Sequence, residues 1–166
     1  MNEAYLCLGG NLGNSFITFK KACGYIEQHI GEIKQYSSIY QSQAWGMSNA
    51  PDFYNQVIKL ETKLSAQELI IALLDIEKTL GRERAEQIEG YQNRLIDIDV
   101  LFFNDEIIKT NMLEIPHPRL QLRKFVLEPL CEIASDFIHP LLKKNITQLV
   151  AVCADKGQVK KLEHAL

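Results

Sequence analysis

The sequence is short of cysteines, of long apolar runs and of positive charge, and each shortage excludes a class of protein. It has four cysteines in 166 residues, none of them in a C-x-x-C pair, which favours reduced packing thiols over disulfides or metal ligands. No segment approaches the roughly 18 uninterrupted apolar residues of a membrane-spanning helix. The first residues also lack the basic and apolar regions of a secretion signal. We therefore expect a soluble, cytoplasmic protein.

The charge balance argues against a nucleic-acid partner. The net charge is −3, whereas non-specific binding to nucleic acid needs a clear basic excess. The composition, 46% apolar and 23% charged, is that of an ordinary globular protein. A chain of this length buries roughly 70% of its unfolded surface as one domain. We expect a single domain over 1–166 that acts on small molecules, with no membrane partner and no obligate protein partner.

The arginines are clustered, although the lysines are spread along the chain. Guanidinium groups suit bidentate contact with phosphate better than ammonium groups do. Chance clustering on a solvated face explains the pattern equally well. All five arginines fall in one stretch of the sequence: Arg82, Arg84, Arg94, Arg119 and Arg123.

Apolar periodicity predicts alternating strands and helices in the first half of the chain. Residues 4–8 form a short apolar strand that ends at the glycine-rich turn GGNLGN, residues 9–14. Helical spacing of apolar residues follows, and Gly31 is a natural stop. Residues 32–41 then have the pattern of a strand, and residues 42–52 that of a loop.

The second half of the pattern repeats this order. A strand begins at Phe53, with alternate residues on its two faces. Ser65 and Glu68 make a capping box for a helix that closes at Gly81. Residues 95–103 give the clearest strand of the chain. The order strand, helix, strand, strand, helix, strand is typical of a ferredoxin-like α+β fold, an antiparallel sheet with helices packed on one face.

Beyond residue 104 the pattern predicts additions to this fold. A short apolar segment at 107–108 is followed by C-terminal helices near 126–134 and 146–154. Residues 159–162 have the composition of an edge strand.

The segment RLIDIDVLFF carries the strongest chemical signal. A strand has a period of two, so Asp97 and Asp99 project from one face with their Cα atoms roughly 6.6 Å apart. Two carboxylates in so apolar a strand need a cationic partner, and a pair of Mg²⁺ ions that clamp phosphate oxygens is a natural one. A solvated face, or ion pairs with arginines, is the alternative. We expect Leu95, Leu101 and Phe103 on the aspartate face and Ile96, Ile98, Val100 and Phe102 on the other.

Three arginines flank this strand in the sequence. Arg82 and Arg84 follow the predicted helix stop, and Arg94 immediately precedes the strand. If the stretch from 82 to 94 folds over the two aspartates, the guanidinium groups of these three arginines offset the charge that develops in phosphoryl transfer. We expect this stretch to act as a lid that closes over bound substrates. A charged surface loop is the alternative.

Two further motifs are less specific. GGNLGN is not a Walker A loop, because no Lys-Ser or Lys-Thr follows it, so a tight turn into a helix is its expected role. His117 lies between Pro116 and Pro118, which restrict the local backbone. With Arg119 and Arg123 after it, His117 is a candidate phosphate contact, although a lone histidine is more often structural.

The chain resembles the 6-hydroxymethyl-7,8-dihydropterin pyrophosphokinase family from the first strand to about residue 134. Single motifs of this kind are weak, but six in the family's order are specific. They are GGNLGN at 9–14, SSIYQSQAWG at 37–46, APDFYNQV at 50–57, LGRER at 80–84, RLIDIDVLFF at 94–103 and PHPRLQLRKFVLEPL at 116–130.

The resemblance implies a site in which ATP and a pterin lie side by side. It implies that Asp97 and Asp99 hold two Mg²⁺ ions that bridge the ATP phosphates, and that Arg82, Arg84 and Arg94 are catalytic. The pterin-binding residues that it implies are Ser42, Trp45, Phe53, Asn55 and Phe125, with the two phenylalanines stacked on the ring. The ATP-binding residues that it implies are Glu77, Arg84, His117 and Arg123.

The resemblance also implies the reaction. The primary hydroxyl of the pterin attacks the β-phosphorus of ATP, and AMP leaves. The chain departs from the family's pattern at two places. One is the loop EQIEGYQNR before Arg94, where we expect Tyr91 to stand in for the family's aromatic residue. The other is the pterin rim, which has the sequence Gln43-Ala44-Trp45. It also has Met112 and Glu114 near the expected adenine site.

Two other functions compete with this reading. A non-catalytic ferredoxin-like regulatory module explains the fold but leaves the paired aspartates and clustered arginines unused. A palm-type nucleotidyl transferase also places metal-binding carboxylates on such a sheet, but the acidic balance argues against a nucleic-acid acceptor. Release of AMP with a hydroxymethyl-dihydropterin as acceptor distinguishes the pyrophosphokinase from both.

Overall fold

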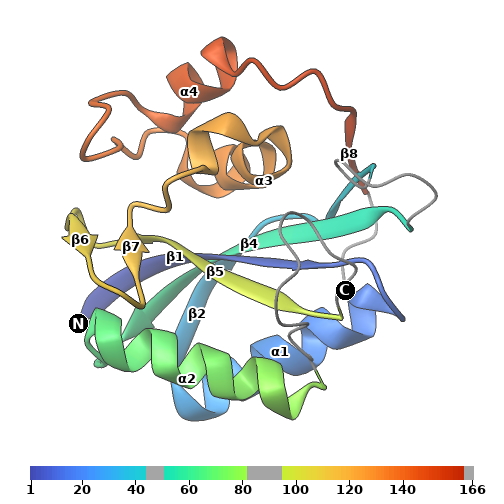
Figure 1. The fold of residues 1–166 in the computed structure, drawn as a ribbon, viewed down its shortest axis with the longest axis vertical. Helices are drawn as coiled ribbons and strands as arrows, with labels where there is room; N and C mark the ends of the chain where they lie inside the picture. Colours follow the sequence, from blue (N-terminus) through green and yellow to red (C-terminus); the bar gives the residue numbers. More distant parts are fainter. Residues whose placement is uncertain (44–50, 82–94, 163–166) are drawn as a thin grey trace.

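The computed structural model describes residues 1–43, 51–81 and 95–162, and its centre is an antiparallel sheet (Figure 1). The order of the strands is β5-β1-β4-β3-β8, and β2 also pairs with β4. The strands are β1 (Asn2–Gly10), β2 (Gly31–Tyr36), β3 (Tyr40–Ser42), β4 (Phe53–Thr62), β5 (Asp97–Phe103) and β8 (Val159–Lys161).

Helices cover both faces of this sheet. In Figure 1, α1 (Ser15–His29) and α2 (Ala66–Thr79) lie below it, whereas α3 (Lys124–Ala134) and α4 (Ile146–Val152) lie above it. The antiparallel α+β prediction is therefore confirmed, with the C-terminal helices placed on the face that the first two leave open. The chain between β5 and α3 forms a small hairpin, β6 (Ile108–Lys109) with β7 (Glu114–Ile115), and a 3₁₀ turn, η1 (Leu120–Leu122).

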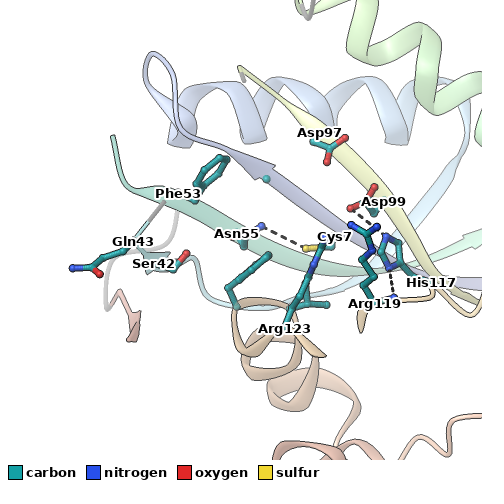
Figure 2. Close-up of a pocket in the computed structure, with 13 residues that line it drawn as sticks. Cys7, Ser42, Gln43, Phe53, Asn55, Asp97, Asp99, His117, Arg119 and Arg123 are labelled. Atoms are coloured by element: carbon teal, nitrogen blue, oxygen red, sulfur yellow. Dashed lines mark hydrogen bonds and ion pairs between the residues drawn. The ribbon is translucent and has the colours of Figure 1, made fainter. Parts of the chain in front are cut away.

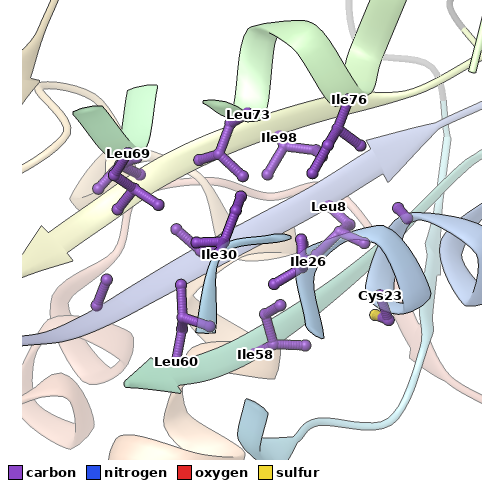
Figure 3. Packing of buried hydrophobic residues seen from close by; sticks show 14 of the residues in the cluster. Leu8, Cys23, Ile26, Ile30, Ile58, Leu60, Leu69, Leu73, Ile76 and Ile98 are labelled. Atoms are coloured by element: carbon purple, nitrogen blue, oxygen red, sulfur yellow. The ribbon is translucent and has the colours of Figure 1, made fainter. Parts of the chain in front are cut away.

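Strand β1 is buried on both faces, so it joins two hydrophobic cores. Leu6 and Leu8 pack with the α1 and α2 side, where Leu73 of α2 completes the contact (Figure 3). Tyr5 and Cys7 pack with the α3 and α4 side. Each fully buried leucine contributes about 1.5–3 kcal/mol. The candidate site lies at the C-terminal end of β1, between the sheet and the segment that leads into α3.

The predicted capping box is present at the start of α2. Ser65 and Glu68 form both hydrogen bonds of a capping box at α2, at 3.2 and 2.8 Å. The side chain of Asn14 accepts the Ile17 N–H at the start of α1.

Among the residues that the structure describes, no helix is long and apolar enough to cross a membrane.

The structure corrects three local predictions. The segment 32–41 is two strands, because β2 and β3 pair with different parts of β4. The first two glycines of GGNLGN belong to β1, and the turn is made at Gly13, which has a φ of 66°. In β5 the register with β1 skips Leu101. This bulge puts Phe102 with Leu101 in the core on the α3 side and Phe103 in the other core.

The C-terminal predictions agree with the structure within a few residues. The segment at 107–108 overlaps β6, the two helices are α3 and α4, and 159–162 contains β8. Strand β8 pairs antiparallel with β3, so the end of the chain returns to the edge of the sheet.

Candidate active site

A cavity of about 260 Å³ lies between the sheet and the segment that leads into α3. Figure 2 shows its two ends. Phe53, Asn55 and Ser42 lie at one end, and Asp99 and His117 at the other. The cavity takes residues from six parts of the chain. They are Cys7, Gly9, Ser42, Gln43, Phe53, Asn55, Asp97, Asp99, His117, Arg119, Arg123, Phe125 and Val126.

The acidic end is built on β5. Asp97 and Asp99 alternate with the buried residues Ile96, Ile98 and Val100, so both carboxylates face the cavity while their neighbours pack against α1 and α2. The Asp99 side chain is 35% exposed, and Asp97 is also half-buried. The two carboxylates are thus desolvated in part but accessible to a ligand.

His117 faces Asp99 across this end of the cavity. Its Nε2 lies 3.9 Å from Asp99 Oδ2, and its Nδ1 accepts the Arg119 N–H at 3.1 Å. Burial lowers the pKa of His117 to about 4, with a further contribution from the Arg123 charge and an opposing one from Asp97. The neutral ring therefore carries its proton on Nε2, the nitrogen that points to Asp99.

Asn55 lies at the end of the cavity opposite Asp99 and His117. Its amide nitrogen donates to the Leu8 carbonyl at 3.4 Å and to the Cys7 sulfur at 3.7 Å. Its Oδ1 is buried and has no hydrogen-bond partner among the described residues, and the same holds for Ser42 Oγ. Buried acceptors without partners are costly. These two atoms are thus placed for donors that a ligand supplies.

Cys7 and Gly9 form the floor under Asn55. Burial, then the Asp99 charge, raises the pKa of the Cys7 thiol, so the thiol is a packing group rather than a nucleophile. A Cβ added to Gly9 would lie 2.8 Å from the Asn55 amide nitrogen. The carboxamide therefore rests directly on the backbone of β1.

Arg123 and Phe125 form the wall opposite the sheet. They flank Lys124, the first residue of α3, and the Arg123 guanidinium carbon lies 5.7 Å from the centre of the Phe125 ring. Both line the cavity. The start of α3 therefore sets the position of an aromatic face and a cation together.

Most of the predicted site residues that the structure describes meet in this one cavity. Glu77 does not line it. Its side chain is 3% exposed on α2, and its Oε1 accepts the Ile98 N–H at 2.9 Å, which fixes the start of β5. Met112 and Glu114 are exposed and do not line the cavity either. Outside the described residues lie Trp45, Arg82, Arg84, Tyr91 and Arg94, together with the whole predicted lid at 82–94.

Gln43 lines the cavity, in keeping with its expected place at the pterin rim, and four cavity residues were not among the predicted site residues: Cys7, Gly9, Arg119 and Val126. Arg119 carried a signal, since it follows the Pro-His-Pro segment in the arginine cluster. Gly9 also carried one, because it opens the GGNLGN motif, but Cys7 carried none, because an apolar strand does not reveal which of its faces borders a cavity.

Comparisons with known proteins identify the family. A profile of the 7,8-dihydro-6-hydroxymethylpterin-pyrophosphokinase (HPPK) family matches residues 5–135. The chain belongs to this family. An HPPK from Aquifex aeolicus is 38% identical over 89% of this chain and 90% of its own length. One from Haemophilus influenzae is 37% identical over 96% of this chain and 98% of its own length.

Solved structures support the fold independently. The HPPK-DHPS protein of Plasmodium falciparum superposes on 90% of this chain with a TM-score of 0.73 and 18% sequence identity. This chain spans only 44% of that longer chain. At this identity the likeness shows the fold alone, the antiparallel sheet with helices on it.

Proposed function

We propose that the chain transfers the pyrophosphoryl group of ATP to the hydroxymethyl group of 6-hydroxymethyl-7,8-dihydropterin, a step of folate biosynthesis. The observation that carries this proposal is the cavity itself. It joins a pair of carboxylates on β5 to an aromatic and amide end on β3, β4 and α3. One end has the chemistry for a polyphosphate, and the other has that for a flat, polar ring.

The pterin is proposed to bind at the Asn55 end. Phe53 and Phe125 come from opposite walls, and stacking on both faces of a ring contributes about 0.5–1.5 kcal/mol per aromatic pair beyond burial. Asn55 Oδ1 and Ser42 Oγ, which have no partner in the described part of the chain, accept hydrogen bonds from the ring's N–H groups. Trp45 is proposed to complete the rim.

The carboxylate pair fits Mg²⁺. This ion prefers oxygen ligands and keeps several positions for water and phosphate. Asp97 and Asp99 would hold two ions. When bound, the ions neutralise the charge on the phosphate oxygens of ATP.

The other charged residues position the triphosphate. Arg119 and Arg123 supply guanidinium groups to phosphate oxygens, and His117 presents its Nε2–H on the same side. Arg82, Arg84 and Arg94 are proposed to offset the charge that develops during transfer. Glu77 is proposed to support ATP binding by holding the start of β5 through the Ile98 N–H.

The bond changes follow from this arrangement. The oxygen of the pterin's hydroxymethyl group bonds to the β-phosphorus, and the bond from that phosphorus to the oxygen bridging the α-phosphate breaks. AMP leaves with that oxygen, and the hydroxyl proton passes to solvent. The protein contributes mainly by holding both substrates in line and excluding water.

The test is an assay for AMP with ATP, Mg²⁺ and hydroxymethyl-dihydropterin. We expect one AMP and one pterin diphosphate per turnover. Pterin binding without AMP would instead indicate a regulatory module, and release of inorganic pyrophosphate would indicate a nucleotidyl transferase. Either result refutes the proposal.

A further inference from the structure

The segment between α4 and β8 reaches the start of α3 through one side chain. Asp155 Oδ2 accepts the Lys124 N–H at 3.0 Å, across 31 residues of sequence. Its Oδ1 accepts the Gly157 N–H at 2.8 Å, which fixes the carboxylate in place. The side chain is half-buried. A carboxylate from the C-terminal segment thus caps the helix that carries Phe125.

Helix α3 has two local reasons to need an external cap. Its own N-cap residue, Arg123, makes no side-chain capping hydrogen bond, so the first turn gains from an acceptor supplied by another segment. Pro129 lies inside the helix and has no N–H, so the helical hydrogen bond from residue 129 to the Phe125 carbonyl is missing. The first turn of α3 is therefore held by fewer internal bonds than an ordinary helix start.

The same C-terminal segment is also tied to the opposite wall of the cavity. Strand β8 pairs with β3, and Val159 lies opposite Ser42. Glu132 of α3 accepts hydrogen bonds from the Ser38 backbone and hydroxyl and from Tyr40, and Lys161 lies 3.8 Å from it. The chain from Asp155 to Lys161 therefore connects the α3 wall to the β3 wall.

We propose that Asp155 is a positioning residue for the pterin end of the site. By capping α3 it fixes the backbone between Arg123 and Phe125, and so the distance of the Phe125 ring from Phe53 and Asn55. The carboxylate touches neither substrate. This inference rests on the proposed function for its substrate, but its structural part, the cap, is testable in the free protein.

The experiment compares three variants at 25 °C, each first shown to be folded by circular dichroism. Asp155→Ala removes the cap, and Asp155→Asn keeps an acceptor oxygen and is itself a good cap. Asp136→Ala makes the same charge change at an exposed position beyond the other end of α3. Calorimetry measures the affinity for hydroxymethyl-dihydropterin with Mg²⁺ and a non-hydrolysable ATP analogue present, and hydrogen exchange follows the Lys124 amide in the free protein.

Asp155→Ala should weaken pterin affinity about 3- to 10-fold, because the first turn adopts its binding geometry less often. Asp155→Asn should restore it to within about twofold, Asp136→Ala should leave it unchanged, and Lys124 should exchange faster only in Asp155→Ala. Unchanged affinity in Asp155→Ala, or equal loss in Asp155→Asn, overturns the proposal.

Asp155→Glu takes the place of Asp155→Ala if that variant does not fold. It keeps the charge and displaces the carboxylate by one methylene, so unchanged pterin affinity and Lys124 protection in Asp155→Glu also overturn the proposal. Failure of the wild-type protein to form AMP would instead refute the proposed function. The exchange result at Lys124 would still decide whether Asp155 is the cap.

Discussion

Gly9→Ala should weaken pterin binding without unfolding the protein. A Cβ at this position would lie 2.8 Å from the Asn55 amide nitrogen, closer than carbon and nitrogen atoms pack. The β1 backbone is paired on both sides, with β4 and with β5, so it has little freedom to retreat. The Asn55 side chain must therefore rotate away, and its Oδ1 moves with it.

The expected magnitude follows from what the rotation disrupts. The amide loses its hydrogen bonds to the Leu8 carbonyl and the Cys7 sulfur, of which a typical one contributes about 0.5–1.5 kcal/mol. A strained rotamer costs a similar amount. If a free-energy loss of about 1–3 kcal/mol appears entirely in binding, the pterin affinity falls roughly 5- to 150-fold. ATP affinity should change less than twofold, because the charged end of the cavity is built on β5 and the segment before α3.

The chain offers a matched control in Gly24→Ala. A Cβ at Gly24, within α1, meets nothing within 4 Å, and alanine is favoured over glycine in a helix interior by about 1 kcal/mol. That variant should raise the melting temperature by a few degrees and leave both affinities unchanged. The assay is calorimetry of pterin and of an ATP analogue, with thermal unfolding of each variant. Wild-type pterin affinity in Gly9→Ala would refute the placement of Asn55 in the pterin site.

Three further predictions test other parts of the site and the fold. Asp97→Asn and Asp99→Asn should each lower AMP formation at least about 100-fold, since metal-assisted charge stabilisation contributes several kcal/mol, with the circular dichroism spectrum unchanged; near-normal turnover would contradict the metal assignment. Phe125→Ala should weaken pterin binding several-fold and ATP binding much less, as calorimetry would show; an equal loss for both would contradict the stacking role. Burial lowers the pKa of His139, whose Nδ1 accepts two backbone N–H groups. At His139, as at His117, the folded state therefore binds fewer protons, and the free energy of unfolding in urea should fall as pH drops below about 6.5; His139→Gln should reduce this slope, and a slope equal to that of the wild type would contradict the contribution of His139.

Periodicity predicted the element order because the strands and helices obey simple rules of burial. The period of two in β5 placed Asp97 and Asp99 on one face, and the capping box placed the start of α2. The same rule failed after Leu101, because a bulge is a mismatch with the partner strand β1 and leaves no mark in the sequence of β5 alone. The sequence also did not predict which face of the sheet α3 and α4 cover, since this depends on which face α1 and α2 leave open.

Glu77 shows how a local pattern carries more than one interpretation. It lies four residues after Leu73 on the apolar stripe of α2, so its carboxylate was bound to be buried and to need a donor. The resemblance favoured ATP as its partner. In the structure its Oε1 accepts the Ile98 N–H, a contact between elements that neither segment reveals by itself.

Three departures from ordinary packing meet at this cavity. Two half-exposed carboxylates interrupt an apolar strand, two buried acceptors at Asn55 and Ser42 have no partner among the described residues, and a helix start relies on Asp155 from the far end of the chain. Each of these features is costly in isolation. Such local conflicts persist where binding offsets their cost. Their meeting in a single cavity is thus a stronger argument for a two-substrate site than any of the motifs taken alone.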